Sequence, residues 1–68
     1  MSEPASIDII HRLKNHLAIV VGYCELLIPD FDERDRRHRD LQEVLKAGRD
    51  AMALIPELAR RVREENAR

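Results

Sequence analysis

The chain has 68 residues, of which 37% are charged and only 3% are aromatic, so it can form at most one small domain with a thin core. Twelve basic and 13 acidic residues are intermixed and give a net charge of −1, which favours neither nucleic acid nor an anionic membrane as a partner. A single cysteine excludes an intramolecular disulfide, and no Cys/His spacing resembles a metal site. We therefore expect no metal and no cofactor, and we expect self-association to supply the missing burial. No apolar run approaches the ~20 residues of a membrane span and no export signal is recognisable, which indicates a cytoplasmic protein.

The first predicted helix covers about residues 4–28 and is stopped by Pro29. Its apolar residues repeat at alternating steps of three and four, which is typical of a heptad pattern: Ile10, Leu13, Leu17, Val20, Cys24 and Leu27. Ile9, Ile19 and Tyr23 widen this apolar side, so the helix should contact more than one neighbour. His11 lies roughly 150° from the middle of the stripe, on a side that it shares with Asn15, Ala18 and Gly22.

A tight connection at Pro29–Asp32 leads to a second predicted helix over about residues 33–64, with Asp30 or Asp32 as its N-cap. Its heptad pattern consists of Leu41, Leu45, Gly48, Met52, Ile55, Ala59 and Val62, and His38 extends it toward the loop. Pro56 interrupts the pattern and predicts a kink or break just before it. The arginines at both ends of this helix alternate with acidic residues, which indicates a solvated, ion-paired surface.

Together these elements predict an all-α fold in which residues 1–68 form a single domain, a helical hairpin. One hairpin can bury only one stripe of each helix, whereas the apolar sectors are wide enough to need contacts on two sides. A symmetric homodimer would meet this need by forming a four-helix bundle that leaves His11 on the outside.

The segment Ile10–Leu27 resembles the dimerisation and histidine-phosphotransfer domain of bacterial sensor histidine kinases. The match rests on His11, Leu13, Lys14, Asn15, Leu17 and Gly22. The resemblance implies that His11 accepts a phosphoryl group on a ring nitrogen and that Asn15, one turn away, orients the ring or a water molecule. It also implies that a response-regulator receiver domain docks on the first helix around Asn15 to Glu25, through Lys14, Ala18, Val21, Gly22 and Glu25. The small side chains at positions 18 and 22 would leave space for such a partner.

The sequence departs from the family pattern at two positions of this motif. Arg12 replaces the acidic residue that serves as general base in autophosphorylation, and a guanidinium cannot accept a proton. His16 replaces the common proline, which predicts a straighter first helix. In addition, nothing in the 68 residues resembles the nucleotide-binding domain of these kinases, so the sequence is either a stand-alone module or a piece of a longer sensor.

The sequence thus predicts a dimeric histidine-phosphotransfer module of two-component signalling rather than an autonomous ATP-dependent kinase. It would accept or relay a phosphoryl group on His11, to or from a receiver domain. The alternative is a degenerate, non-catalytic dimerisation or adaptor module that binds or inhibits a histidine kinase, and Arg12 favours this alternative. Neither hypothesis involves nucleic acid or a membrane.

Overall fold

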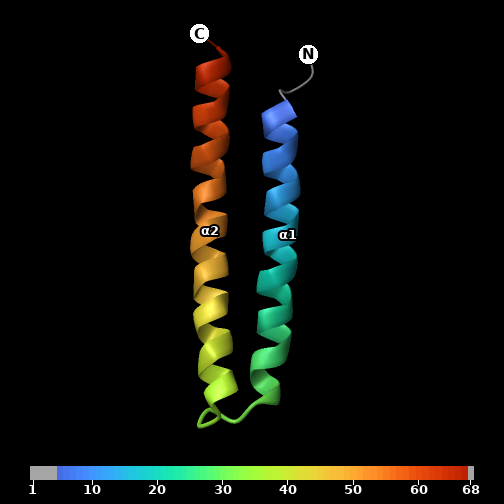
Figure 1. Ribbon diagram of the computed structural model, residues 1–68, viewed down its shortest axis with the longest axis vertical. Coiled ribbons are helices and arrows are strands. Elements are labelled where there is room, and N and C mark those ends of the chain that lie inside the picture. Colours follow the sequence, from blue (N-terminus) through green and yellow to red (C-terminus); the bar gives the residue numbers. More distant parts are fainter. Residues whose placement is uncertain (1–4, 68) are drawn as a thin grey trace.

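The computed structural model describes residues 5–67, which fold into a helical hairpin (Figure 1). Helix α1 covers Ala5–Leu27, a short 3-10 turn η1 covers Ile28–Asp30, and helix α2 covers Arg36–Asn66. The two long helices run antiparallel and side by side, so the start of α1 and the end of α2 lie at the same end of the molecule (Figure 1). The described residues contain no strand, and the all-helical prediction is therefore confirmed.

Helix α1 ends at Leu27, two residues before Pro29. Proline has no backbone N–H and cannot continue the α-helical hydrogen-bond ladder, so the chain tightens into η1. The Phe31 N–H closes this turn by donating to the Ile28 carbonyl at 3.1 Å. The change of direction thus follows directly from the proline.

Helix α2 begins three residues later than the sequence predicts, because Asp35 is its N-cap. The Asp35 carboxylate accepts a hydrogen bond from the Arg37 backbone N–H at 2.8 Å, while Asp32 accepts one from the Arg34 N–H in the preceding turn at 2.8 Å. The expectation that Asp30 or Asp32 caps α2 is therefore wrong. Hydrogen bonds from the Arg37 side chain and backbone lower the pKa of Asp35 to about 2.

The expected break at Pro56 is absent, because α2 continues through this residue from Arg36 to Asn66. Figure 1 shows no sharp bend in α2 at this level. Ile55 and Ala59, on either side of the proline, are both buried in the core that α2 forms with α1. This packing holds the two parts of α2 in line although the proline cannot donate to the Met52 carbonyl.

The interface between the helices, which we call the hairpin seam, is lined on α2 by the predicted heptad residues. The seven heptad residues are all buried or half-buried: Leu41, Leu45, Gly48, Met52, Ile55, Ala59 and Val62. The buried His38 extends the seam toward the loop. On α1 the seam consists of Ile7, Ile10, Leu17, Val21 and Cys24. Leu13, Val20 and Leu27, predicted to share one stripe with Ile10, are instead 44%, 44% and 42% exposed. Helix α2 covers only one edge of the wide apolar sector of α1.

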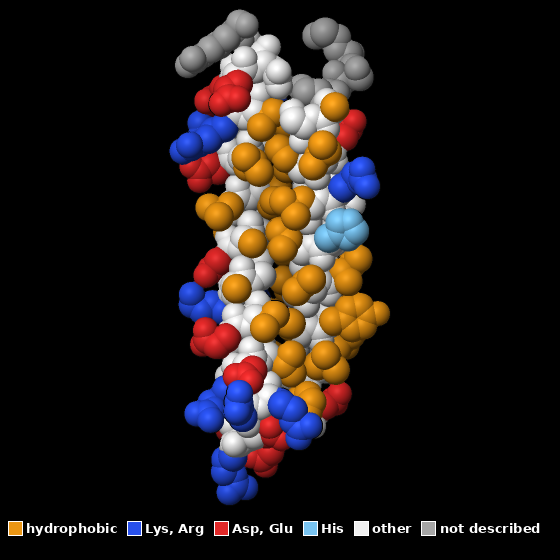
Figure 2. Space-filling view, viewed as in Figure 1, with side chains coloured by type: hydrophobic (Ala, Val, Ile, Leu, Met, Phe, Trp, Pro, Cys, Tyr) orange, Lys and Arg blue, Asp and Glu red, His pale blue; other side chains and the backbone are white. Residues whose placement is uncertain are grey.

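The uncovered edge forms a second heptad stripe. On α1 it contains Ile9, Leu13, Val20, Tyr23 and Leu27, with His16 at the intervening heptad position. On α2 a matching stripe contains Val44, Leu54 and Leu58, with Ala47 and Ala51 between them. We call these two stripes the apolar face. Figure 2 shows hydrophobic side chains gathered over both helices on this side, with charged side chains at the loop end. No helix in the described part of the chain combines the length and hydropathy needed to span a membrane.

Candidate functional site

His11 lies on α1 at the edge of the hairpin seam, where it lines an open hollow of about 190 Å³ between the two helices. Lys14 of α1 and Arg63 of α2 line the same hollow, and its apolar part is formed by Met52, Ile55, Pro56 and Ala59. Its ionisable lining groups are an imidazole, an ammonium and a guanidinium. No carboxylate from the described residues lines this His11 hollow, and His11 and Arg63 each make a further interaction.

The His11 hollow and the apolar face lie on opposite sides of the hairpin. Successive residues of an α-helix are rotated by about 100°, so residues two positions apart lie about 160° apart around the helix. Ile9 and Leu13, on the apolar face, are each two positions from His11. Leu54 and Leu58 stand in the same relation to Pro56, which lines the hollow. His11 and Pro56, which line the hollow, therefore lie on the sides of their helices that point away from the apolar face.

This geometry corrects the predicted position of His11. The sequence places the ring almost opposite a single apolar stripe, whereas the ring lies beside the hairpin seam and opposite the second stripe. The difference arises because the predicted stripe combines residues of both: Ile10, Leu17 and Cys24 from the seam and Leu13, Val20 and Leu27 from the apolar face. His11 is nevertheless exposed, as the prediction required.

The other predicted site residues have different surroundings. Asn15 is exposed one turn after His11 but does not line the hollow. Ala18 is exposed, and a Cβ atom added to Gly22 would meet nothing within 4 Å, so the surface beyond His11 is open, as the small residues predict. Glu25 is exposed and lies 3.7 Å from an Arg49 guanidinium nitrogen, an ion pair that joins the two helices.

Val21 does not belong to a docking surface. Its side chain is 8% exposed and lies in the hairpin seam, where a Cβ atom added to Gly48 would come within 2.9 Å of Val21 Cγ2. Helix α2 therefore covers Val21, in contrast to the exposed Lys14, Ala18 and Glu25. Its position three residues before Cys24 and four after Leu17 places it on the α1 stripe that α2 covers.

The α2 side of the hollow was not predicted, because it depends on how the helices are aligned. Val21 faces Gly48, and in an antiparallel pair ten residues earlier on α1 lie level with ten residues later on α2. This alignment brings His11 level with the turn that contains Pro56 and Ala59. The heptad stripes of both helices determine which α2 residues lie beside His11, but only once the register of the two helices is known.

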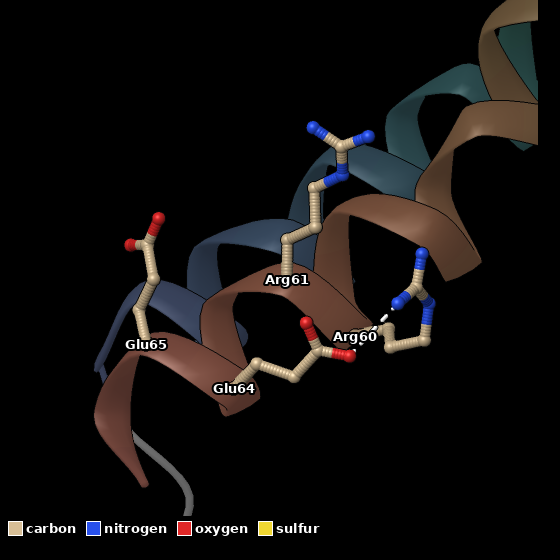
Figure 3. A pocket seen from close by; sticks show the side chains of 4 residues that line it. All are labelled: Arg60, Arg61, Glu64 and Glu65. Carbon is tan, nitrogen blue, oxygen red and sulfur yellow. Dashed lines mark hydrogen bonds and ion pairs between the residues drawn. The ribbon is translucent and has the colours of Figure 1, made fainter. Parts of the chain in front are cut away.

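A larger hollow of about 360 Å³ lies near the C-terminal end of α2 and is lined by Arg60, Arg61, Glu64 and Glu65 (Figure 3). Arg60 and Glu64 form an ion pair at 2.8 Å, and Arg61 pairs with Glu57 at 2.9 Å. All four lining residues come from one helix and their charges offset one another. This hollow therefore has no charge preference that would select a ligand, and its arginines form the ion-paired surface that the sequence predicts.

The two remaining histidines lie elsewhere. His16 is exposed beside Ile9, Arg12 and Leu13 on the apolar face. His38 is buried near the loop, and its Nδ1 atom has no hydrogen-bond partner among the described residues. Of the three histidines, only His11 is exposed on the side away from the apolar face.

Comparison with protein-family models, with curated proteins and with solved structures gives no match to this chain. Within residues 5–67, no group of three or more His, Cys, Asp or Glu side chains is placed to hold a metal ion.

Proposed function

We propose that this chain is a dimeric histidine-phosphotransfer module of two-component signalling, in which His11 exchanges a phosphoryl group with the aspartyl phosphate of a receiver domain. The observation that carries the proposal is the position of His11, exposed beside basic groups on the side of the hairpin opposite the apolar face. One side of the hairpin can then bind a second copy while the other side receives a partner.

The chemistry suits a neutral imidazole. A lone pair of one ring nitrogen attacks the phosphorus in line, the bond between phosphorus and the receiver's aspartate oxygen breaks, and the carboxylate leaves. A neutral imidazole has this lone pair, so the step needs no general base. Arg12 therefore does not prevent the transfer. Autophosphorylation as in sensor histidine kinases would instead lack the carboxylate that serves there as general base.

A second copy of the same hairpin is the proposed occupant of the apolar face. The hydrophobic core of the described residues comprises only six buried side chains, which is little for a stable domain. The exposed stripes carry no charged residue at their heptad positions from 9 to 27 and from 44 to 58. Because the stripes continue in parallel along both helices, two hairpins related by a twofold axis would pack them together as a four-helix bundle.

Two neighbouring exposed residues test the dimer. Leu54 lies on the apolar face and Ala53 does not, although both are exposed in a single hairpin. Leu54→Glu should convert the dimer to a monomer in sedimentation velocity, whereas Ala53→Glu should leave it intact. A wild-type chain that sediments as a folded monomer, or equal behaviour of the two variants, would contradict the proposal.

Label transfer tests the chemistry. A panel of receiver domains charged with radiolabelled acetyl phosphate is incubated with the wild-type chain, with His11→Gln and with His16→Gln as the matched control. Acid-labile, base-stable label is expected on the wild type and on His16→Gln, and none on His11→Gln. Label that persists in His11→Gln, or no label from any receiver, would refute the proposed transfer.

A non-catalytic adaptor is the second candidate, and Arg12 is the observation that favours it. Such a protein would form mixed four-helix bundles with a complete histidine kinase through the apolar face and would inhibit it. Mixed dimers without label on His11 in the same assay would identify this function.

A further inference from the structure

We propose that pH controls the association of two hairpins through the apolar face, because His16 lies at the centre of that face. This inference rests on the dimer of the proposed function. Histidine changes its charge between pH 5 and 8, and a neutral imidazole is buried at much lower cost than a charged one. The chain is therefore dimeric at neutral pH and dissociates on acidification.

His16 occupies a heptad position of the α1 stripe, between Leu13 and Val20. In a single hairpin its side chain is exposed and lines an open hollow of about 310 Å³ together with Ile9, Arg12 and Leu13. A single hairpin can therefore protonate the ring without burying a charge. Only a second copy on the apolar face makes protonation costly.

The two stripes of the apolar face are centred at the same level of the hairpin. The α1 stripe runs from residue 9 to 27 and the α2 stripe from residue 44 to 58, so their midpoints are positions 18 and 51. Because Val21 faces Gly48 in the antiparallel hairpin, these two midpoints lie level with each other. A second hairpin covers both stripes completely only when it is centred on this level.

His16 is two positions from the midpoint, so a second copy buries it in the middle of the interface. A twofold axis along the bundle places the two His16 rings at the same level. A twofold axis across the bundle places His16 of one copy level with Val20 of the other, so the two rings are four positions, about 6 Å, apart along the bundle. In both arrangements two imidazolium charges would approach each other, and their repulsion adds to the cost of burial.

The charged groups around the interface do not compensate a proton on His16. On α1, Arg12 lies one turn before His16 and adds a like charge, and Tyr23 adds only a hydroxyl group. On α2 the stripe from 44 to 58 contains no charged residue. Two carboxylates flank this stripe near the level of His16, and both are ion-paired: Asp50 with Lys46 at 3.0 Å and Glu57 with Arg61 at 2.9 Å.

A third flanking carboxylate, Glu43, lies nearer the loop. In the register set by Val21 and Gly48 it is level with Leu26, ten positions from His16 of the same copy. With the twofold axis across the bundle, it is six positions from His16 of the other copy. Among the described residues, the dimer therefore brings no unpaired carboxylate to the level of the ring.

Sedimentation equilibrium of the full chain across this pH range tests the inference. For the wild type we expect a dimer dissociation constant about ten-fold higher at pH 5.5 than at pH 8, because each dimer buries two rings in their neutral form. His16→Leu and His16→Gln should form dimers whose dissociation constants are independent of pH in this range. His11→Gln is the matched control, because it removes an exposed α1 histidine that lies away from the apolar face, and it should keep the wild-type response.

A wild-type dimer with equal dissociation constants at the two pH values would overturn the inference, and so would a wild-type response in both His16 variants. The dimer of the proposed function would stand in either case. A wild-type chain that is a folded monomer at both pH values would instead contradict the proposed dimer, and this inference with it.

Discussion

Gly48 leaves room for the Val21 side chain in the hairpin seam, and an alanine substitution at position 48 tests this packing. A Cβ atom at position 48 would lie 2.9 Å from Val21 Cγ2, whereas one at position 22 would meet nothing within 4 Å. Replacing a helical glycine by alanine stabilises a helix by about 1 kcal/mol where space is open. Overpacking a core costs about 1–3 kcal/mol, and the branched, buried valine cannot rotate away freely.

Because the helix-propensity gain is common to both positions, the difference between Gly22→Ala and Gly48→Ala isolates the overpacking cost. We expect Gly22→Ala to be more stable than the wild type by about 1 kcal/mol and Gly48→Ala to be about 1–3 kcal/mol less stable than Gly22→Ala. The assay is urea unfolding followed by far-UV circular dichroism at one fixed protein concentration, since association changes the apparent stability. Adding Val21→Ala to Gly48→Ala should recover part of the loss in a double-mutant cycle. Equal stability of the two glycine variants would refute the helix register described above.

Three further substitutions test single features of the hairpin. His38→Leu should raise the free energy of unfolding by about 1–3 kcal/mol, because it removes a buried nitrogen without a hydrogen-bond partner; a less stable variant in urea unfolding would show that the ring has a favourable role. Pro56→Ala should stabilise α2 by up to about 3 kcal/mol by restoring a backbone donor, and an unchanged thermal midpoint would argue against that reasoning. Asp35→Ala should be less stable than the wild type at neutral pH. Since the pKa of Asp35 falls from 3.8 to about 2 on folding, the difference should be complete above about pH 5 and should be lost as the pH falls through 3.8 to below 2. A pH-independent difference in unfolding midpoints would rule out the carboxylate as its source.

The heptad pattern of α2 predicted its buried face because the large apolar residues off that face are few, which leaves one strong stripe. The pattern of α1 was ambiguous, because its apolar sector is wide enough to hold two stripes of the same period. The single predicted stripe therefore combined Ile10, which lies in the seam, with Leu13, which lies on the apolar face. Which edge of the α1 apolar sector is buried depends on where α2 packs.

Part of the candidate site could be predicted from the sequence and part could not. His11, Lys14 and Gly22 lie close together in the sequence, so a local motif was enough to find them. Arg63 and Pro56 reach the hollow through the alignment of two helices, which rests on contacts such as that between Val21 and Gly48. The N-cap of α2 was missed for a local reason, because three aspartates within six residues could each fill that role and Asp32 is used by the turn instead.

Native mass spectrometry of the chain after incubation with a phosphorylated receiver domain tests the central claim most directly, because one spectrum reports both association and phosphorylation. We expect a dimer that carries up to one phosphoryl group per chain, and the same dimer without phosphoryl groups in His11→Gln. A folded monomer, or a dimer whose phosphoryl content is unaffected by His11→Gln, would contradict it.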